Sequence, residues 1–539
     1  MRKLLFLLSI LITTTAFAQT GNIRGFVYEK ESGEPVMFCN VVLKGTTIGA
    51  ATDINGMYNI SKLKAGNYTL VVTYIGYDTT EVNISLKAGK ILSQNIEIGE
   101  SSIKLNEVTI SAERDEMRTE VKAAAIKISK QDMEMMPTIG GEPDLAQYMQ
   151  VIPGVVFTGD QGGQLYIRGG SPIQNKVLLD GMIIYSPFHS IGLFSVFDTE
   201  IIRNTDVYTG GFSAEYGGRV SSIMDIKTID GNKKEVGGKL SANTFGSKLF
   251  VEGPLSQSGS SSFVFSGKTS YLDKSSDLLY KYPILYFDEK GLPYSYTDLY
   301  GKLSSKAKNG SKISVFGFNF TDNVNYEGIS ELNWDAKGVG SEFILIPGGS
   351  PVLIEGNFAW SSYNISLDEA ASPLRESGIQ GFNMGFDFTY FQPKGKIKYG
   401  FDIHGFSTDF LTYNSVNSKI EQNVNTSEFS AYVNYQFTST RWIVEPGLRF
   451  QYYGDLGTSI EPRLGIKYIA TEKIRLKLSS GLYSQNILST TSDRDVVNLF
   501  TGIISSPDEI PEKADGTPYK NQFQKARHLI AGIEYDISR

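Results

Sequence analysis

The chain has 539 residues, a formal charge of −7, and many glycine (55), phenylalanine (31) and tyrosine (30) residues, with a single cysteine. A single cysteine excludes an intrachain disulfide framework, and the acidic balance argues against a nucleic-acid partner, which requires a basic surface. Beyond the N-terminus no run of about 18 apolar residues occurs, so a helical membrane protein is excluded and only a closed β-barrel could cross a membrane.

The first residues have the pattern of a secretory signal peptide. Arg2 and Lys3 precede an apolar run over residues 4–12, and small residues follow it. This order predicts cleavage between Ala18 and Gln19. The alternative, a membrane anchor, is disfavoured because the run is far shorter than the ~20 residues that a spanning helix needs. Cys39 lies too far from the cleavage point for a lipoprotein, so we interpret it as a small core residue.

Residues 19–98 are predicted to form a small all-β sandwich. Short β-rich runs alternate with turn signals about every ten residues, which is typical of that architecture. The segment resembles the carboxypeptidase-regulatory-like, transthyretin-like family, and the matching residues are 25–27, 40–47, 52–58 and 65–70.

One stretch of this segment, Asp53 to Gly56, has the beginning of a calcium-binding loop. An EF-hand loop starting at Asp53 would need glycine at its sixth position and glutamate at its twelfth, but these are Tyr58 and Lys64. We therefore favour the other interpretation, a β-turn with Asn-Gly at its tip.

Residues 99–122 are predicted to be a linker that contains one short extended segment. By pattern alone this segment is either a last sandwich strand or a separate linker strand. It resembles the TonB box of TonB-dependent receptors of Bacteroidetes-type bacteria, which a partner captures by adding it as a strand to its own sheet. We call it the coupling strand; its residues are Leu105, Asn106, Glu107, Val108, Thr109, Ile110, Ser111 and Ala112.

Residues 123–230 are predicted to form a mixed α/β domain. The pattern indicates a helix around residues 144–150 and strands at 125–128, 165–168, 177–180, 201–208 and 221–228. Several separated motifs resemble the plug of TonB-dependent receptors in the family's order. They lie at residues 151–155, 167–170, 177–181 and 207–219.

The resemblance assigns candidate site residues to these plug motifs. They are Arg168, Gly169, Gly170, Asp180, Gly181, Glu215, Tyr216, Gly217 and Arg219. Gly169 and Gly170 would allow a tight turn with positive φ, and Glu215 and Arg219 are expected on a loop rather than in a packed interior. In the family such charges pair with the inner barrel wall, so we expect Arg168, Glu215 and Arg219 to act as latches. The alternative is exposed ion pairs worth under ~1 kcal/mol.

Residues 231–539 are predicted to be part of an antiparallel transmembrane β-barrel, which makes the fold class mainly β. Long segments alternate apolar and polar residues, for example over 382–390 and 442–450. Tight turns are expected at 392–395 and 438–441, and a long connection at 493–523. We expect about 12 strands, whereas a barrel that encloses a plug needs ~22. The chain is therefore expected to be the N-terminal part of a longer protein and unable to close a pore by itself.

The resemblance implies an outer-membrane receptor that imports a scarce or large ligand with energy from the inner-membrane proton gradient. Implied partners are a TonB-type energy transducer, outer-membrane lipids and an unidentified siderophore, glycan or peptide, with a surface lipoprotein as a further candidate. The sandwich and the coupling strand would lie in the periplasm. We expect no cofactor, no metal and no enzymatic activity, because hydrolase and phosphate-binding motifs are missing and His189, His404 and His528 are dispersed. The alternatives are a structural or adhesive surface protein and a surface ligand-binding or signalling receptor without import.

Overall fold

The computed structural model describes residues 20–101, 121–138, 142–157, 163–190, 192–274, 293–326, 328–370, 372–392, 394–414, 416–490, 500, 502–505, 513, 515–517 and 523–537. The predicted signal peptide, its cleavage point at Ala18 and Gln19, and the coupling strand lie outside these residues. The mainly β fold class is confirmed, and none of the described helices is long and apolar enough to cross a membrane.

The N-terminal segment is a sandwich of two four-stranded sheets. One sheet has the order β4-β1-β7, with β8 also paired to β1, and the other has the order β3-β2-β5-β6. Apolar side chains from both sheets, among them Ile23, Val41 and Leu70, meet in one core. The strands are β1 (Gly21–Glu29), β2 (Asn40–Leu43), β3 (Gly49–Ala51), β4 (Met57–Leu63), β5 (Gly66–Thr73), β6 (Thr80–Leu86), β7 (Ile91–Ser93) and β8 (Ile96–Ile98).

Two sequence interpretations inside the sandwich are confirmed. Cys39 is a buried core residue, and burial raises the pKa of its thiol to about 12. The loop between β3 and β4 is a turn in which Asp53 Oδ1 accepts hydrogen bonds from the backbone N–H groups of Asn55 and Met57, both at 2.9 Å. The carboxylate of Asp53 is thus used to hold the turn.

The plug is a five-stranded sheet of order β13-β12-β15-β14-β9 with short helices around it. Ser129 and Asp144 accept hydrogen bonds from the first turns of the two α-helices. The predicted helix and strands are found, and α3, β10 and β13 are additional. The elements are β9 (Ala125–Ser129), α3 (Lys130–Glu134), α4 (Leu145–Met149), β10 (Val155–Phe157), β11 (Leu165–Ile167), η1 (Pro172–Gln174), β12 (Asn175–Leu179), β13 (Met182–Ile184), η2 (Thr199–Ile201), β14 (Ile202–Tyr208) and β15 (Ser222–Thr228).

The rest of the chain forms one antiparallel sheet of 14 described strands, which we call the wall. The expected number was about 12; the sequence pattern is weakest in short strands with few apolar residues, such as β16. The wall strands are β16 (Gly237–Ala242), β17 (Gly246–Pro254), β18 (Ser261–Ser270), β19 (Tyr294–Lys306), β20 (Lys312–Tyr326), β21 (Ser330–Leu345), β22 (Val352–Glu369), β23 (Ser372–Gln392), β24 (Gly395–Tyr413), β25 (Lys419–Thr438), β26 (Trp442–Tyr452), β27 (Thr458–Ile469), β28 (Ile474–Gln485) and β31 (Gln524–Tyr535).

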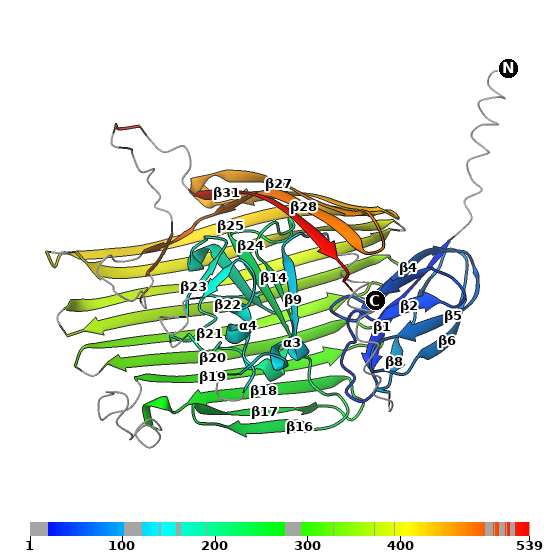
Figure 1. Ribbon diagram of the computed structural model, residues 1–539, viewed down its shortest axis with the longest axis horizontal. Coiled ribbons are helices and arrows are strands. Elements are labelled where there is room, and N and C mark those ends of the chain that lie inside the picture. The colour runs from blue at the N-terminus through cyan, green and yellow to red at the C-terminus, as the bar shows by residue number, and fades with distance from the viewer. Residues whose placement is uncertain are drawn as a thin grey trace.

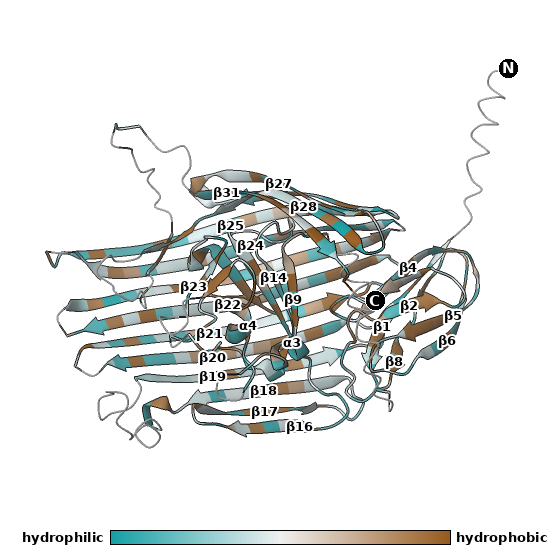
Figure 2. Cartoon of the chain, viewed as in Figure 1, coloured by the Kyte–Doolittle hydropathy of each residue, from teal (hydrophilic) through white to brown (hydrophobic). Residues whose placement is uncertain are grey.

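The plug lies against one face of the wall, and the sandwich lies at one end of the wall strands (Figure 1). Brown and teal residues alternate along these strands in Figure 2. Phe358 and Leu448 on the outer face are 54% and 47% exposed, whereas Phe316 and Arg449 on the inner face are buried. Neighbouring residues of a strand point to opposite faces, so the predicted alternation separates an apolar outer face from an inner face that packs on the plug.

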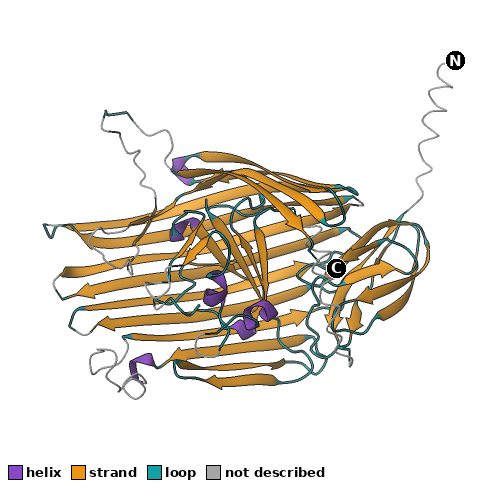
Figure 3. Cartoon of the chain, viewed as in Figure 1, coloured by secondary structure: helices purple, strands orange, loops and turns teal. Residues whose placement is uncertain are grey.

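The strand bounds show that the two ends of the wall differ in the number of residues that connect neighbouring strands; Figure 3 shows the wall strands in orange, with the sandwich beside one end of them. The predicted tight turns at 392–395 and 438–441 are confirmed, and both lie at the end beside the sandwich, where Arg24 Nη1 reaches the carbonyl of Ser350 at 2.5 Å. We call this the short-turn end. Residues 271–293 and 486–523 connect strands at the other end, the long-loop end. There β29 (Ile487–Thr490) and β30 (Gly502–Ser505) form an additional two-stranded pair that the sequence pattern did not predict.

Candidate functional site

The interface between the plug and the wall contains most of the candidate residues. On the plug side it is formed by the loop 209–221, the β12–β13 hairpin and the segment around His189. On the wall side it is formed by charged and amide side chains on the inner face of the strands.

Two wall arginines bind the backbone of the plug loop. Arg463 Nη1 donates to the carbonyls of Ser213 and Tyr216, each at 2.5 Å. Arg449 Nη1 donates to the carbonyls of Ala214 (3.1 Å) and Glu215 (3.2 Å). These bonds satisfy main-chain acceptors that have no helix or sheet partner, which a buried loop requires.

Both arginines are in turn neutralised by wall carboxylates. Arg463 Nη2 lies 2.6 Å from Glu461, and Arg449 Nη2 lies 2.9 Å from Asp402. Arg449 is fully buried and Arg463 is 5% exposed. Buried ions of this kind are held only when they are paired and hydrogen-bonded, so the loop carbonyls complete the coordination of two otherwise costly charges.

Glu215 makes an ion pair across the interface. Its Oε2 lies 2.6 Å from Nζ of Lys398 on β24, and Oε1 accepts a hydrogen bond from Ser213 Oγ at 2.6 Å. Burial alone would raise the pKa of Glu215, but Lys398 and Lys122 outweigh it and hold the pKa well below its ordinary value. Glu215 therefore pairs with a cation of the wall, where a latch was expected.

Glycine at position 217 is required by a close approach of the wall. A Cβ on Gly217 would lie 2.1 Å from Nε of Arg449. Next to it, the hydroxyl of Tyr216 donates to Asp225 Oδ2 at 2.9 Å and so ties the loop to β15. The loop was expected to hold its charges outside a packed interior, and that expectation is wrong, because the wall covers it.

Arg219 is buried within the plug and bonds to backbone rather than to the wall. Its Nη1 donates to the carbonyl of Gly218 (2.7 Å) and its Nε to that of Asn175 (3.3 Å). Arg219 and Lys176 line a cavity of about 110 Å³ between the plug, the wall and β30. Among the described residues no carboxylate lies within ion-pair distance of Arg219, so its expected pairing with the wall is absent there.

Arg168 follows β11 on an exposed turn. Arg168 and Gly169 have positive φ (48° and 80°), whereas Gly170 does not; a Cβ on Gly170 would instead lie 2.3 Å from Ser221 Oγ. Arg168 Nε donates to Thr209 Oγ1 at 3.1 Å, within the plug. Arg168 is exposed, and no carboxylate of the described chain pairs with it.

The β12–β13 hairpin carries the second pair of candidate residues, Asp180 and Gly181, both with positive φ. Asp180 Oδ2 lies 3.0 Å from Nζ of Lys302 on β19, and Asp180 Oδ1 accepts from the backbone of Thr228 at 3.0 Å. The carbonyl of Gly181 accepts from Asn383 Nδ2 at 2.8 Å. The tip of the hairpin is thus bound to the wall through both a charge and its backbone.

His189 forms a third contact that the sequence did not reveal. Its ring nitrogens lie 2.9 Å from Asp322 and 2.8 Å from Asp298, and the ring stacks on Tyr296 with centroids 4.0 Å apart. Burial alone would lower the pKa of His189, but the two carboxylates outweigh it and raise the pKa above its ordinary value. Only the fold brings these aspartates of β19 and β20 to the histidine, so no local sequence signal could have identified the trio.

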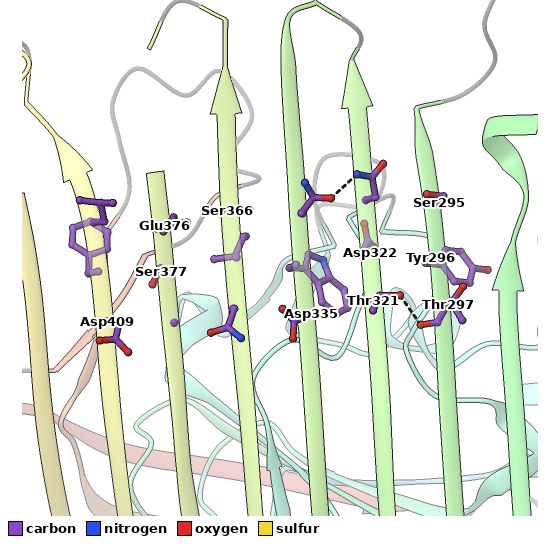
Figure 4. A pocket seen from close by; sticks show the side chains of 18 of the residues that line it. Ser295, Tyr296, Thr297, Thr321, Asp322, Asp335, Ser366, Glu376, Ser377 and Asp409 are labelled. Carbon is purple, nitrogen blue, oxygen red and sulfur yellow. Dashed lines mark hydrogen bonds between the residues drawn. The ribbon is translucent and has the colours of Figure 1, made fainter. Parts of the chain in front are cut away.

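A groove of about 930 Å³ crosses β18 to β25 towards the long-loop end. Its labelled residues form one band across neighbouring strands in Figure 4. Thr297 and Asp335 alternate with the same phase as the exposed Leu299 and Val339, so they lie on the outer face. Asp322 has the opposite phase and contacts His189 on the inner face. Tyr296 and Trp334, which also line the groove, have the same phase as Asp322, so residues of both faces of the wall line it.

The described residues contain no group of three or more histidine, cysteine, aspartate or glutamate side chains that could hold a metal ion. The polar contacts of the interface instead join one part of the chain to another. Their arrangement can hold a separate domain against a β-wall and release it when the charges are pulled apart.

Two family models match the chain. A CarboxypepD_reg-like domain matches residues 23–110, and a TonB-dependent receptor plug domain matches residues 118–222. The chain therefore contains these two domains in that order, in agreement with the resemblance found in the sequence.

Curated relatives are TonB-dependent receptors. The chain is 28% identical to the receptor SusC of Bacteroides thetaiotaomicron over 239 residues, which are 43% of this chain and 23% of the relative. It is 24% identical to a TonB-dependent receptor of Formosa agariphila over 193 residues, which are 34% of this chain and 18% of the relative. The chain thus matches only about a fifth to a quarter of the length of these relatives.

Solved structures share the fold. The ferric enterobactin receptor of Pseudomonas aeruginosa superposes with a TM-score of 0.54 at 14% identity, covering 78% of this chain and 70% of that chain. The FrpB iron transporter of Neisseria meningitidis superposes with a TM-score of 0.55 at 15% identity, covering 77% of this chain and 71% of that chain. At these identities the likeness concerns the fold alone.

Proposed function

We propose that this chain, which carries the plug domain of a TonB-dependent receptor, belongs to an outer-membrane receptor that imports a scarce or large ligand with energy from the inner-membrane proton gradient. The observation that carries the proposal is a plug held by buried ion pairs and backbone hydrogen bonds against the inner face of a long antiparallel wall. Such a plug blocks a passage until a force or a ligand shifts it.

The outer face of the wall supports a position in a lipid bilayer. Its exposed side chains are large and apolar on strand after strand; they include Leu249, Phe265, Leu303, Val339, Phe358, Phe382, Val433, Leu448, Ile460 and Leu476. Transmembrane barrels present an apolar band of this kind to lipid and keep their polar residues inside. Outer-membrane lipids are then partners of this face.

The short-turn end is assigned to the periplasm, since outer-membrane barrels have short periplasmic turns and longer extracellular loops. The sandwich and the coupling strand would then lie in the periplasm, within reach of a TonB-type energy transducer. Ligand would arrive from the long-loop end, above the plug, and a surface lipoprotein could assist its capture there.

The mechanism follows from the chain path. The coupling strand precedes β9, the edge strand of the plug sheet. A transducer that adds this strand to its own sheet and pulls would apply force to that edge. The contacts of Glu215, Asp180 and the loop carbonyls are individually worth a few kcal/mol at most, so they can be broken one after another. Glu215, which pairs with Lys398 of the wall, is the proposed latch residue, whereas Arg168 and Arg219 bond within the plug in the described chain.

The ligand class is left open among siderophores, glycans and peptides. SusC and the siderophore receptors share the plug or the fold with this chain, and the relatives are receptors and transporters rather than enzymes. Fold does not decide among such ligands. Growth of a knockout strain on different iron, glycan and peptide sources would identify the class.

The proposal is tested in cells that produce the native protein with or without residues 105–112. We expect the deletion to abolish uptake that depends on the proton gradient while surface binding of the same labelled ligand is unchanged. Dissipating the gradient with a protonophore should have the same effect on the undeleted protein. Unaltered uptake in the deletion strain would contradict import by this route, and binding without any uptake in either strain would favour a receptor that does not import.

A further inference from the structure

The sandwich is docked on the short-turn end of the wall through apolar and polar contacts. Phe26, Tyr28 and Met57 of the sandwich share a buried cluster with Ile344, Ile346 and Leu353 of the wall. Apolar burial between two parts of a chain stabilises their contact. The sandwich is thus a bound domain, and its linker continues directly into the plug.

Polar contacts fix the orientation of the docked sandwich. The guanidinium of Arg24, which is 2% exposed, donates to the carbonyls of Ser350 (2.5 Å) and Pro347 (2.6 Å) in the turn between β21 and β22. Asn95 Nδ2 donates to the carbonyl of Lys308 at 3.3 Å in the turn between β19 and β20. Both turns belong to the short-turn end, so the sandwich covers this rim of the wall.

Glu34 of the sandwich also reaches the plug. Its Oε2 lies 2.8 Å from Nη2 of Arg203 on β14 and accepts from the backbone N–H of Asp230 at 3.2 Å. Its Oε1 lies 3.5 Å from Nζ of Lys233. Arg203 and Lys233 are both buried. Glu34 therefore serves as a counter-charge for two cations that belong to the plug and to the start of the wall.

These cations are part of one continuous cluster that also holds the plug to the wall. Asp230 lies 3.3 Å from Arg203, 3.7 Å from Lys233, 2.9 Å from Lys312 and 3.8 Å from Lys302. Lys302 in turn pairs with Asp180 at the tip of the plug hairpin and with Glu342 of the wall, both at 3.0 Å. The members joined by ion pairs are the cations Arg203, Lys233, Lys302 and Lys312 and the carboxylates Glu34, Asp180, Asp230 and Glu342.

While the sandwich is docked, the ion pairs of this cluster match four cations with four carboxylates. Glu34 is its one member from the sandwich among the described residues, and without it four cations would face three carboxylates. Removing one partner of a buried ion pair is strongly destabilising, because it leaves an uncompensated charge in a low-dielectric site. Loss of Glu34 would weaken the ion pairs of Arg203 on β14. Through Asp230 and Lys302 it would also weaken the ion pair of Asp180 at the tip of the plug hairpin.

We propose that the sandwich is a releasable cap on the short-turn end, and that Glu34 makes the hold of the plug depend on the docking of this cap. When the sandwich leaves the rim, Arg203 and Lys233 lose a counter-charge and the plug is loosened from the wall. On the proposed function, on which this inference rests, a pull on the linker would act on the cap and on the plug together. Import would then begin with undocking of the sandwich.

The test is hydrogen–deuterium exchange of the whole chain in detergent micelles, comparing the native protein with Glu34→Gln. We expect exchange in β14 and in the turn 347–350 to become faster by about tenfold or more, while the core strands β2 and β5 keep their protection. The matched control is Glu31→Gln, an exposed carboxylate of the same loop, which should change neither. Unchanged exchange in β14, with or without faster exchange at 347–350, would overturn the proposal.

A covalent tether provides a test that does not depend on Glu34. A bismaleimide between Asn95→Cys and Lys308→Cys would hold the sandwich on the rim, and the buried Cys39 would stay unmodified. We expect the tether to slow exchange in β14 by about tenfold, as blocking a sub-global opening does. A control tether inside the sandwich, between Lys44→Cys and Glu81→Cys, should have no effect on β14. Equal exchange in β14 with both tethers would overturn the proposal that the sandwich is a releasable cap. Absence of ligand uptake would count against the proposed import and would leave these exchange measurements valid.

Discussion

At the scale of single residues, the plug loop 213–216 is held mainly through its backbone. Arg449 and Arg463 donate to four carbonyls of the loop 213–216. A guanidinium is suited to this, because its planar fork offers several donors in fixed directions. Side chains of the loop are used less, apart from the ion pair of Glu215. The shape of the loop therefore matters more to the hold than the identity of its side chains.

Replacing Arg463 with alanine should loosen the plug. The change removes two short bonds to plug carbonyls and leaves Glu461, which is 1% exposed, without its cation. We expect the free energy needed to detach the plug from the wall to fall by about 3–5 kcal/mol. The measurement is limited proteolysis of the plug in micelles, which should become faster. Arg527→Ala, at an exposed position of β31, is the control. Equal proteolysis of the two variants would mean that the arginine does not hold the loop.

His189 should make the hold of the plug depend on pH. The pKa of His189 is raised in the folded protein, so its contribution to stability is complete below the unfolded pKa of about 6.5. It is lost as the pH rises through the folded value. We expect His189→Gln to abolish this pH dependence. The variant should also hold the plug more weakly at neutral pH, because it lacks two charge-assisted hydrogen bonds of ~1.5–3 kcal/mol each. The measurement is plug proteolysis against pH; parallel curves for both proteins would contradict the role of His189.

At the scale of elements, the sequence predicted what alternation and turn residues can specify. A period of two and turn residues are local signals. They allowed about twelve strands of the wall, the tight turns at 392–395 and 438–441, and the plug strands β9, β11, β12, β14 and β15 to be recognised. The pair β29–β30 was missed, since strands of four residues have no measurable period. The wall has fourteen described strands where about 12 were expected, because a short strand with few apolar residues, such as β16, gives only a weak pattern.

Only the plug residues of the candidate site could be predicted from the sequence, and their partners on the wall could not. The plug motifs named Asp180, Gly181, Glu215 and Gly217, all of which contact the wall. Their partners Lys302, Lys398 and Arg449 are single charged residues at inward positions of long strands, and nothing local distinguishes them from other polar residues there. Arg219 was assigned to the wall and instead binds plug carbonyls, because its direction depends on the packing of a loop that the wall covers.

The loop between β14 and β15 gives a prediction at this scale. In Gly217→Ala the new Cβ would overlap Nε of Arg449, which lies 2.1 Å from the ideal position. We expect a loss of about 1–3 kcal/mol in the stability of the plug contact, as in other overpacked sites, measured by hydrogen exchange in β15. Gly532→Ala on β31 is the control, because its nearest neighbour would be at 3.8 Å. A native exchange pattern in Gly217→Ala would show that the loop is not tightly packed.

The outer face of the wall gives a second prediction. Leu448 on β26 is 47% exposed and lies in the apolar band. Leu448→Arg should cost about 2–4 kcal/mol in bilayers, the value for arginine near the midplane, measured by denaturant titration of folding into lipid vesicles. Thr321→Arg, on the polar part of the same face, should cost ~1 kcal/mol or less. If the two substitutions cost the same, the apolar band does not face lipid.

At the scale of the whole molecule, the order of the domains along the chain decides where a pull on the coupling strand would act. The sandwich, the coupling strand and the plug follow one another in the chain, and the charge cluster around Asp230 joins the sandwich, the plug and the wall in space. Burial alone would raise the pKa of Asp230, but Lys312, Arg203, Lys233 and Lys302 hold it well below its ordinary value. The chain order and the charge cluster thus connect the sandwich to the plug by two separate routes.

The central claim is that a TonB-type transducer grips the coupling strand. The most direct measurement is binding of the transducer's purified periplasmic domain to the receptor in nanodiscs, comparing the native protein with one in which residues 105–112 are replaced by a glycine-serine sequence of equal length. We expect the periplasmic domain to bind the native protein. The replacement should lower the affinity by about tenfold or more, since strand addition supplies much of the contact. Equal affinity for the two proteins would contradict it.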